Sequence, residues 1–291
     1  MEVGTGKYKY ELIENFAKLP EGETFGVISR VTTDSRNRLY VFQRKDPAVL
    51  IFDRDGKFVH SWGSGEFKRA HGFKIVGDLA YVTDQTDNVA MIYTLEGTLI
   101  KQLGTRGQHS DTGCEDWHNL PLRAAGPFNH PTELMPGPSG DLYVTDGYRN
   151  SRVHRFTKDG ELIQSWGQPG KSAPGEFHLP HSMAISPEGT LYVSDRANAR
   201  VQVFTPEGKF IGMWTGMGGA NDMARDENGI FYLCEQATPT SKHGISVRDG
   251  NGAVLARWET PPTHGMGIDA SGNIYAGVTS GGRVNKYLRM H

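Results

Sequence analysis

Hydrophobic and polar positions along this chain repeat in a unit of four short strands. The second strand of each unit is an apolar segment with a tyrosine at the same place, and these segments span residues 39–42, 80–83, 142–145, 191–194, 231–234 and 274–277. In the first four units a polar turn, a third apolar strand and a Gly-containing turn follow, as expected for a hairpin, and a fourth strand completes the unit. Six repeats of four strands, each about 40–50 residues long, predict an all-β fold, a six-bladed β-propeller.

The two ends of the chain complement each other in this pattern. The sixth unit ends after its third strand, near Tyr287, whereas residues 8–13 have strand character but no unit of their own. We therefore expect residues 8–13 to supply the outer strand of the sixth blade, because closure of the ring removes the free sheet edges. On this interpretation residues 1–291 form a single β-propeller domain, and a linear solenoid explains the missing strand less well.

Two intervals between units are longer than the others and contain insertions. They cover roughly residues 105–127 and 168–179. Loops of this length in a compact fold are usually functional or disordered. Both insertions precede the first strand of a unit, so we expect them on the same face, with 105–127 as a candidate lid.

Composition narrows the classes of partner. The net charge is −2 with both signs interspersed, so no basic surface for nucleic acid or for a membrane is expected. No apolar run approaches the roughly 20 residues that span a bilayer. The first residues lack a signal-peptide core, which favours a cytoplasmic location, although a trimmed secreted chain would look the same. Cys114 and Cys234 lie in different repeats and are not expected to form a disulfide. A monomer is favoured.

A polar residue is expected to open each inner strand, and histidine predominates at this position. The six residues are Ser29, His71, His130, His181, Asn221 and His264. In a closed six-bladed ring the second, fourth and sixth blades lie about 120° apart, so His71, His181 and His264 would each point one imidazole at the axis. Three imidazoles with an open fourth position are typical of a catalytic zinc site. His130 and Asn221 would be outer-shell groups or a fourth ligand. The alternative for each histidine is a structural role, in which it satisfies a backbone group.

Two arginines and a tyrosine follow second strands and face the same end of the predicted ring: Arg44, Tyr148 and Arg196. Two guanidinium groups near a cation indicate an anionic ligand, since arginine binds carboxylates in bidentate fashion. The hydroxyl of Tyr148 would act as a base. The alternative is that the arginines pair with aspartates of the turns, namely Asp46, Asp146 and Asp195.

These residues resemble a known family. Residues 146–152, 166–167, 175–184 and 195–202 resemble the NHL-repeat propellers, and most closely peptidyl-α-hydroxyglycine α-amidating lyase. The resemblance covers about the whole chain and is strongest from residue 128 to 204. It implies zinc ligands at His71, His181 and His264, a catalytic tyrosine at Tyr148, and active-site arginines at Arg44 and Arg196.

The resemblance also implies a calcium ion. In the family this ion is held by backbone carbonyls at the positions of Val31 and Phe73 and by an acidic residue directly after the third histidine. Here Gly265 occupies that acidic position. The family's disulfides are absent, and Pro262-Thr263 replaces a Met-Pro pair.

The activity implied is that of a zinc-dependent lyase. It would cleave the C–N bond of a carbinolamide (an α-hydroxy amide) to an amide and an aldehyde such as glyoxylate. Tyr148 would be the base, and Arg44 and Arg196 would bind the carboxylate of a small-molecule substrate. Two alternatives stay open: a non-catalytic NHL propeller that serves as a protein-binding scaffold, and a zinc lyase or hydratase for another small hydroxy-acid derivative. A calcium-dependent lactonase is disfavoured, because hard cations prefer oxygen ligands and these positions are rich in imidazole.

Overall fold

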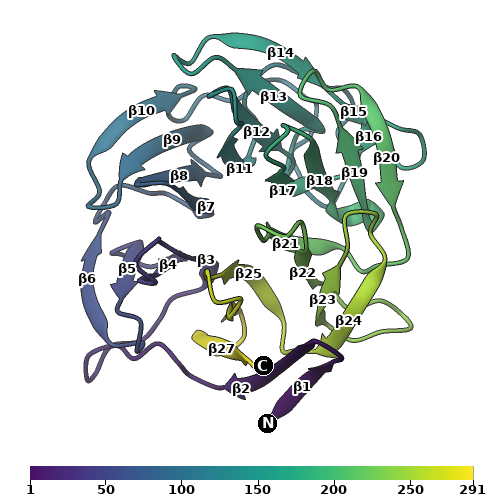
Figure 1. Ribbon diagram of the computed structural model, residues 1–291. Coiled ribbons are helices and arrows are strands. Elements are labelled where there is room, and N and C mark those ends of the chain that lie inside the picture. The colour runs from purple at the N-terminus through teal and green to yellow at the C-terminus, as the bar shows by residue number, and fades with distance from the viewer. Residues whose placement is uncertain (291) are drawn as a thin grey trace. The chain divides into compact units, whose positions relative to one another are not determined.

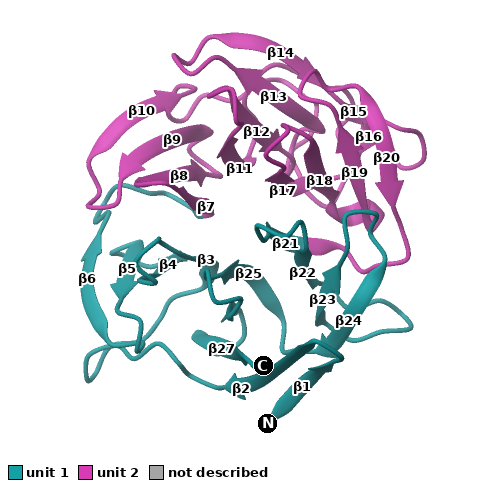
Figure 2. Ribbon diagram, in the orientation of Figure 1, with its two compact units in different colours: residues 1–70, 221–291 teal, residues 71–220 magenta. Residues whose placement is uncertain are grey.

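The computed structural model describes residues 1–290, and within them the only helical element is a short 3₁₀ turn, η1 (Arg196–Asn198). The chain divides into two compact units, shown in Figure 2. Unit 2 is residues 71–220, and unit 1 combines residues 1–70 with the chain from residue 221 onward. The prediction of one domain over residues 1–291 stays a prediction.

Unit 1 consists of three antiparallel blades (Figure 1). Two of them have four strands in chain order: β3 (Ile28–Thr33), β4 (Leu39–Gln43), β5 (Val49–Phe52) and β6 (Phe58–Trp62), then β21 (Ala220–Arg225), β22 (Phe231–Glu235), β23 (Gly244–Arg248) and β24 (Val254–Glu259). The third has five strands in the order β1 (Glu2–Thr5), β2 (Tyr8–Ile13), β27 (Arg283–Arg289), β26 (Ile274–Val278) and β25 (Thr263–Ile268).

The N-terminal strand completes the sixth blade, as predicted. Strand β2 pairs antiparallel with β27, from Tyr10 opposite Arg289 to Ile13 opposite Lys286. Strand β1 extends this sheet beyond the expected four strands.

Unit 2 consists of three further four-stranded antiparallel blades. Their strands are β7 (Ala70–Val76), β8 (Leu79–Asp84), β9 (Val89–Thr94) and β10 (Leu99–Leu103), then β11 (Pro131–Pro136), β12 (Leu142–Asp146), β13 (Arg152–Phe156) and β14 (Leu162–Trp166), then β17 (Pro180–Ile185), β18 (Leu191–Asp195), β19 (Arg200–Phe204) and β20 (Phe210–Trp214). A short parallel pair, β15 (Gln168–Pro169) and β16 (Glu176–Phe177), lies in the second insertion. Six blades, one for each predicted repeat, confirm the all-β, six-bladed propeller class.

The hydrophobic core lies between neighbouring blades of each unit. The second strands β4, β12, β22 and β26 are buried at every residue, because both of their faces are covered. The repeated tyrosines join these layers: Tyr143 of β12 packs with Met183 and Leu191 of the next blade, and Tyr275 of β26 packs with Val31 and Val41. Outer strands such as β6 and β14 are largely exposed.

A β-bulge near the start of the first strand recurs in four blades. In β3, β11, β17 and β25 the pairing register skips one residue on the first strand, and the skipped residues are Ser29, Thr132, His181 and His264. A bulge of this kind redirects the side chain of the extra residue. The bulge therefore sets the direction in which the side chains of His181 and His264 point from their strands.

The predicted position of His130 in this pattern is wrong. The bulge of β11 falls on Thr132, and His130 precedes the strand with φ 64°. Its structural equivalent is Leu179, with φ 69°, since each residue stands directly before the proline that begins a strand. Aligning Pro131 with Pro180 would have revealed the correct register.

Within residues 1–290 no helix is long and apolar enough to cross a membrane. Cys114 and Cys234 are both buried, and neither takes part in a disulfide.

Candidate metal centre

Two of the predicted zinc ligands are brought together within unit 2. His71 is the second residue of β7 and His181 the second residue of β17, and both side chains are fully buried. Their ring centroids lie 4.8 Å apart, and their candidate ligand nitrogens lie within 4.8 Å of each other. Two imidazoles at this separation are nitrogen donors of the kind that zinc prefers.

A backbone carbonyl fixes the tautomer of His71. Its Nδ1 lies 2.7 Å from the carbonyl oxygen of Thr132, and two electronegative atoms at that distance need a hydrogen between them. We therefore assign the hydrogen to Nδ1, which leaves the lone pair on Nε2. Histidines that bind metals typically donate their other ring N–H to such a carbonyl, so His71 fits a zinc ligand.

The hydroxyl of Tyr148 lies between the two imidazoles. It is 3.2 Å from Nε2 of His71 and 3.1 Å from Nε2 of His181. Nη1 of Arg196 donates to the same oxygen at 3.2 Å. Because a hydroxyl has one hydrogen, it can donate to only one of the two ring nitrogens at a time. It can therefore donate to Nε2 of His71, whose lone pair is assigned, while the guanidinium of Arg196 donates to the same oxygen.

The segment that carries Arg196 is fixed by a buried carboxylate. Asp195 ends β18 and accepts hydrogen bonds from Nε of Arg200 at 2.7 Å and from Nδ2 of Asn198 at 2.8 Å. Burial raises the pKa of Asp195, while these two donors and the backbone N–H of His178 lower it. The backbone N–H of Arg196 donates to Leu179 at 3.1 Å. Asp195 thus bonds to the turn that places Arg196.

Two other predicted residues of unit 2 are His130, whose backbone bonds to Tyr148, and Phe73. The carbonyl of His130 accepts from the N–H of Tyr148 at 3.4 Å, and the N–H of His130 donates to Asn88 at 2.9 Å. Phe73, a predicted calcium residue, is fully buried in β7 and is followed by Lys74.

In unit 1, Nδ1 of His264 faces a backbone carbonyl, as Nδ1 of His71 does in unit 2. Its Nδ1 lies 2.8 Å from the carbonyl oxygen of Ser29, so we assign the hydrogen to Nδ1 and the lone pair to Nε2. Nδ2 of Asn221 donates to the carbonyl of Thr263, the residue before His264, at 2.8 Å. Asn221 therefore holds the strand of the third predicted ligand.

Arg44, also in unit 1, is held in place by one hydrogen bond from its backbone and one from its side chain. Its N–H donates to Val27 at 2.9 Å, and its Nε donates to the carbonyl of Ala70 at 3.2 Å. The Nε bond fixes the plane of the guanidinium, and Ala70 is the residue directly before His71 in the sequence.

Gly265 leaves no room for the acidic residue that the family resemblance implies beside calcium. A Cβ on Gly265 would lie 2.4 Å from Cα of Arg30, so no carboxylate side chain can be accommodated there. Val31 directly follows the fully buried Arg30, and Phe73 directly precedes Lys74. Calcium sites gather carboxylate and carbonyl oxygens, and position 265 can supply no side-chain oxygen.

The long insertion reaches Tyr148, which the sequence did not indicate. Trp117 packs edge-on against Tyr148 with ring centroids 5.5 Å apart, and it stacks on His118 at 3.7 Å. The base of the loop is anchored, because Nδ2 of Asn129 donates to the carbonyl of Ser110 at 2.9 Å. Trp117 itself is 36% exposed, so it borders Tyr148 and also presents aromatic surface to solvent.

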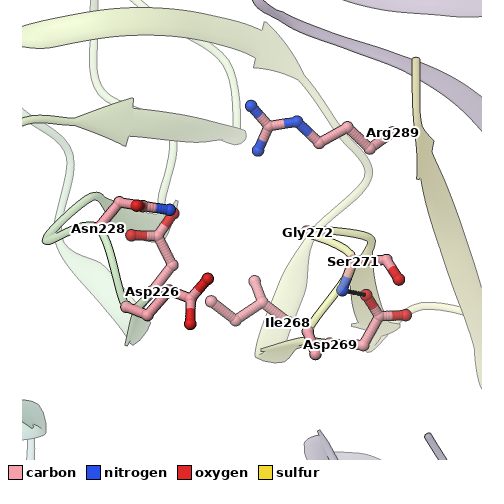
Figure 3. A pocket seen from close by; sticks show the side chains of 9 residues that line it. Asp226, Asn228, Ile268, Asp269, Ser271, Gly272 and Arg289 are labelled. Atoms are coloured by element: carbon pink, nitrogen blue, oxygen red, sulfur yellow. Dashed lines mark hydrogen bonds between the residues drawn. The ribbon is translucent and has the colours of Figure 1, made fainter. Parts of the chain in front are cut away.

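Figure 3 shows a separate pocket of about 450 Å³ in unit 1. Ile268, the last residue of β25, lines it, whereas His264 is the second residue of that strand. The pocket's carboxylates shape turns: Asp269 accepts from the N–H of Ser271 at 2.9 Å, and Asp226 accepts from the N–H of Ile230 at 2.8 Å. These hydrogen bonds show that the carboxylates stabilise the turns that line the pocket.

Comparison with known proteins agrees with the repeat seen in the blades. Residues 177–204, which run from the end of the second insertion through β19, match the family model of the NHL repeat. The chain carries an NHL repeat. This repeat includes His181 and Arg196 and lies in the region where the sequence resemblance is strongest.

Similar proteins include one named for its NHL repeats and one named as a lyase. NHL repeat-containing protein 3 of Homo sapiens is 31% identical over 72% of this chain and 61% of its own length. Peptidyl-alpha-hydroxyglycine alpha-amidating lyase 1 of Drosophila melanogaster is 29% identical over 61% of this chain and 34% of its own length. The chain therefore spans about three fifths or less of these relatives. The predicted resemblance to NHL propellers and to the amidating lyases is confirmed.

A solved streptogramin B lyase has a similar fold. It superimposes with a TM-score of 0.67, covering 96% of this chain and 97% of its own, at 12% sequence identity. Identity this low supports the shared fold of the NHL-repeat chain and nothing about its chemistry.

Proposed function

We propose that the protein is a zinc-dependent lyase that cleaves the C–N bond of a carbinolamide to an amide and an aldehyde such as glyoxylate. The observation that carries this proposal is the Tyr148 hydroxyl, which lies within 3.2 Å of both Nε2 atoms of His71 and His181 and receives a hydrogen bond from Arg196. A tyrosine beside two imidazoles and a guanidinium suits proton transfer at a metal site. The amidating-lyase name of several relatives supports the same reaction class.

His71, His181 and His264 would hold the zinc. Two of them, His71 and His264, have Nδ1 bonded to a backbone carbonyl, which directs the Nε2 lone pair away from the strand. When bound, zinc would supply Lewis acidity toward a substrate oxygen.

Tyr148 would take the proton from the substrate hydroxyl and return it to the leaving nitrogen. The electron pair of the O–H bond becomes the second bond of the new carbonyl, and the C–N pair leaves with the nitrogen. The nitrogen receives the proton, so the products are a neutral amide and an aldehyde. Tyr148 would react as the phenolate, become a phenol when it takes this proton and return to the phenolate when it gives the proton up, and Arg196 would stabilise the phenolate through the bond that it already makes to this oxygen.

Arg44 and Arg196 would bind the carboxylate next to the carbinol carbon. The guanidinium plane of Arg44 is set by its bond to Ala70, which reduces the freedom lost when a ligand binds. The substrate would therefore be a small α-hydroxy amide that carries a carboxylate, and the monomer would suffice as the active species.

Two measurements on the purified protein test the proposal. Elemental analysis should give one zinc per chain, and an assay of aldehyde release should show turnover of α-hydroxyglycine amides or ureidoglycolate that stops after chelation. A comparison of hydroxy acids with and without the amide distinguishes a carbinolamide lyase from a zinc lyase or hydratase for another hydroxy-acid derivative. Protein that holds no zinc and turns over none of these compounds would refute the lyase.

The second candidate is a non-catalytic scaffold. The chain is similar to NHL repeat-containing protein 3, a protein named for its repeats, as well as to the amidating lyases. A scaffold would tolerate substitution of His71 without change in partner binding, whereas the lyase would lose both zinc and turnover.

A further inference from the structure

Unit 1 contains a guanidinium that is completely removed from solvent. Arg30 is the third residue of β3, directly after the bulge residue Ser29, and its side chain is 0% exposed. A buried charge costs several kcal/mol unless it is paired and hydrogen-bonded. Its Nε lies 3.5 Å from Oδ2 of Asp222, which is also 0% exposed. The fold therefore retains a buried ion pair at this place.

Asp222 connects this pair to the strand of His264. Its Oδ2 accepts from the backbone N–H of Met266 at 2.9 Å, and its Oδ1 accepts from the N–H of Met223 at 2.8 Å. Met266 stands two residues after His264 on β25. The carboxylate is thus satisfied by two backbone donors and a guanidinium.

Arg30 contacts both carbonyls that define the orientation of His264. Its Nη1 donates to the carbonyl of His264 at 3.1 Å and reaches the carbonyl of Ser29 at 3.4 Å. The Ser29 carbonyl is the acceptor for Nδ1 of His264. The same Nη1 lies 3.2 Å from Nδ1 itself. Movement of Arg30 would therefore disturb the backbone of His264 and the acceptor that fixes its tautomer.

Gly265 permits this arrangement because it has no side chain. A Cβ at this residue would lie 2.4 Å from Cα of Arg30 and 2.6 Å from the carbonyl oxygen of Ser29. Both atoms belong to the backbone, so strands β25 and β3 approach too closely here for any side chain at position 265.

A related pair occurs independently in unit 2. Glu133 is the residue after the bulge of β11, as Arg30 is in β3, and its side chain is 0% exposed. It accepts from Oγ of Ser182 at 3.1 Å and from the N–H of Met183 at 3.0 Å, and Nζ of Lys74 lies 3.8 Å away. Ser182 and Met183 directly follow His181, so a buried carboxylate with a partly buried lysine beside it supports this histidine strand as well.

We propose that Arg30 is an internal cation that, with Asp222, positions His264 and takes the place of the calcium ion implied by the family resemblance. The protein then keeps the histidine in register without calcium. Arg30 is a positioning residue, since it acts through His264. The zinc part of this inference rests on the proposed function, whereas the tautomer of His264 and the independence from calcium do not.

The test uses the full chain and begins with zinc-free protein. NMR of nitrogen-15-labelled histidine should show His264 with its hydrogen on Nδ1 in the wild type and a mixture of tautomers in Arg30→Met. Arg30→Lys, which keeps the charge but loses the planar fork, provides a milder variant if Arg30→Met does not fold. The control is Arg38→Met. Arg38 forms an ion pair with Asp34 in the same blade, at the turn between β3 and β4, and the substitution removes this pair. An unchanged His264 tautomer in folded Arg30→Met or Arg30→Lys would overturn the proposal.

Metal measurements complete the test. Competition with a chelator should give a zinc dissociation constant about 10–100-fold higher in Arg30→Met than in Arg38→Met, the loss typical when the partner of a metal ligand is removed. Wild-type thermal unfolding should be the same in calcium and in a calcium chelator. Stoichiometric calcium binding that raises the unfolding temperature would contradict the substitution of calcium by Arg30. If the wild type binds no zinc, the proposed function fails, while the tautomer and calcium measurements still decide the role of Arg30.

Discussion

Replacement of Tyr148 by phenylalanine tests the proposed base most directly. The change removes one oxygen from a side chain that is 6% exposed and leaves the ring packing intact. The ring contacts His71 and His181 with centroid distances of 5.0 Å and 5.5 Å, and these contacts do not depend on the hydroxyl. The imidazole nitrogens and Arg196 stay in place. The variant should therefore retain zinc and substrate binding but lose the proton acceptor.

The magnitude follows from the role assigned. Loss of a positioned general base lowers kcat by about 10²–10⁴-fold. At 1.36 kcal/mol for each tenfold change, this corresponds to about 2.7–5.4 kcal/mol in activation free energy. KM should change little, because Arg44 and Arg196 still hold the carboxylate.

The assay measures aldehyde release at saturating substrate, with the zinc content determined on the same samples. Tyr143→Phe is a matched control, since Tyr143 of β12 also has a buried ring and its hydroxyl donates to Pro206 at 3.2 Å, away from the histidines. Tyr143→Phe should keep wild-type kcat. Wild-type turnover by zinc-loaded Tyr148→Phe would refute the base assignment, and loss of zinc in this variant would assign Tyr148 a structural role instead.

Three further predictions follow from the same site and its surroundings. His181→Ala should abolish stoichiometric zinc and turnover, and elemental analysis that still finds one zinc per chain would contradict the ligand assignment. Trp117→Ala should raise KM about 3–10-fold for substrates with an apolar amide group, since one aromatic contact is worth about 0.5–1.5 kcal/mol. Leu122 lies in the same loop and is 79% exposed, so Leu122→Ala should leave KM unchanged. Burial and Lys171 lower the pKa of His178, so protonation favours the unfolded chain and the free energy of unfolding should fall as the pH drops below about 6.5. His178→Asn should flatten this dependence in urea titrations, and an equal slope in both proteins would exclude His178 as its source.

The repeat could be predicted from the sequence because its signals are local. An apolar strand with a tyrosine, a polar turn and a Gly-containing turn lie within a few residues of one another and recur along the chain. The closing strand could be predicted as well, because residues 8–13 and the incomplete sixth unit fit together by count. Neither inference requires knowledge of which blades touch.

The register of the first strands was only partly predictable. His71, His181 and His264 were expected to open their first strands and are the second residues of those strands, whereas His130 precedes its strand and Thr132 is the second residue. The bulge that decides this position is a property of pairing with the next strand, and two residues oppose one across the ladder. The carbonyl of Thr132 then becomes the acceptor for His71, which the pattern of residue types did not indicate.

The sequence by itself determined the strand repeat, the closing N-terminal strand and the residue types offered for chemistry, since each depends on neighbours in the chain. Only the tertiary structure decided that the Tyr148 hydroxyl lies between two histidines and that Arg30 is buried against Asp222. These contacts join residues far apart in sequence, and their geometry depends on bulges and on the close approach of strands at Gly265. A buried charge or hydroxyl is stable only beside its partner, so its position is set by packing between blades and not by local pattern.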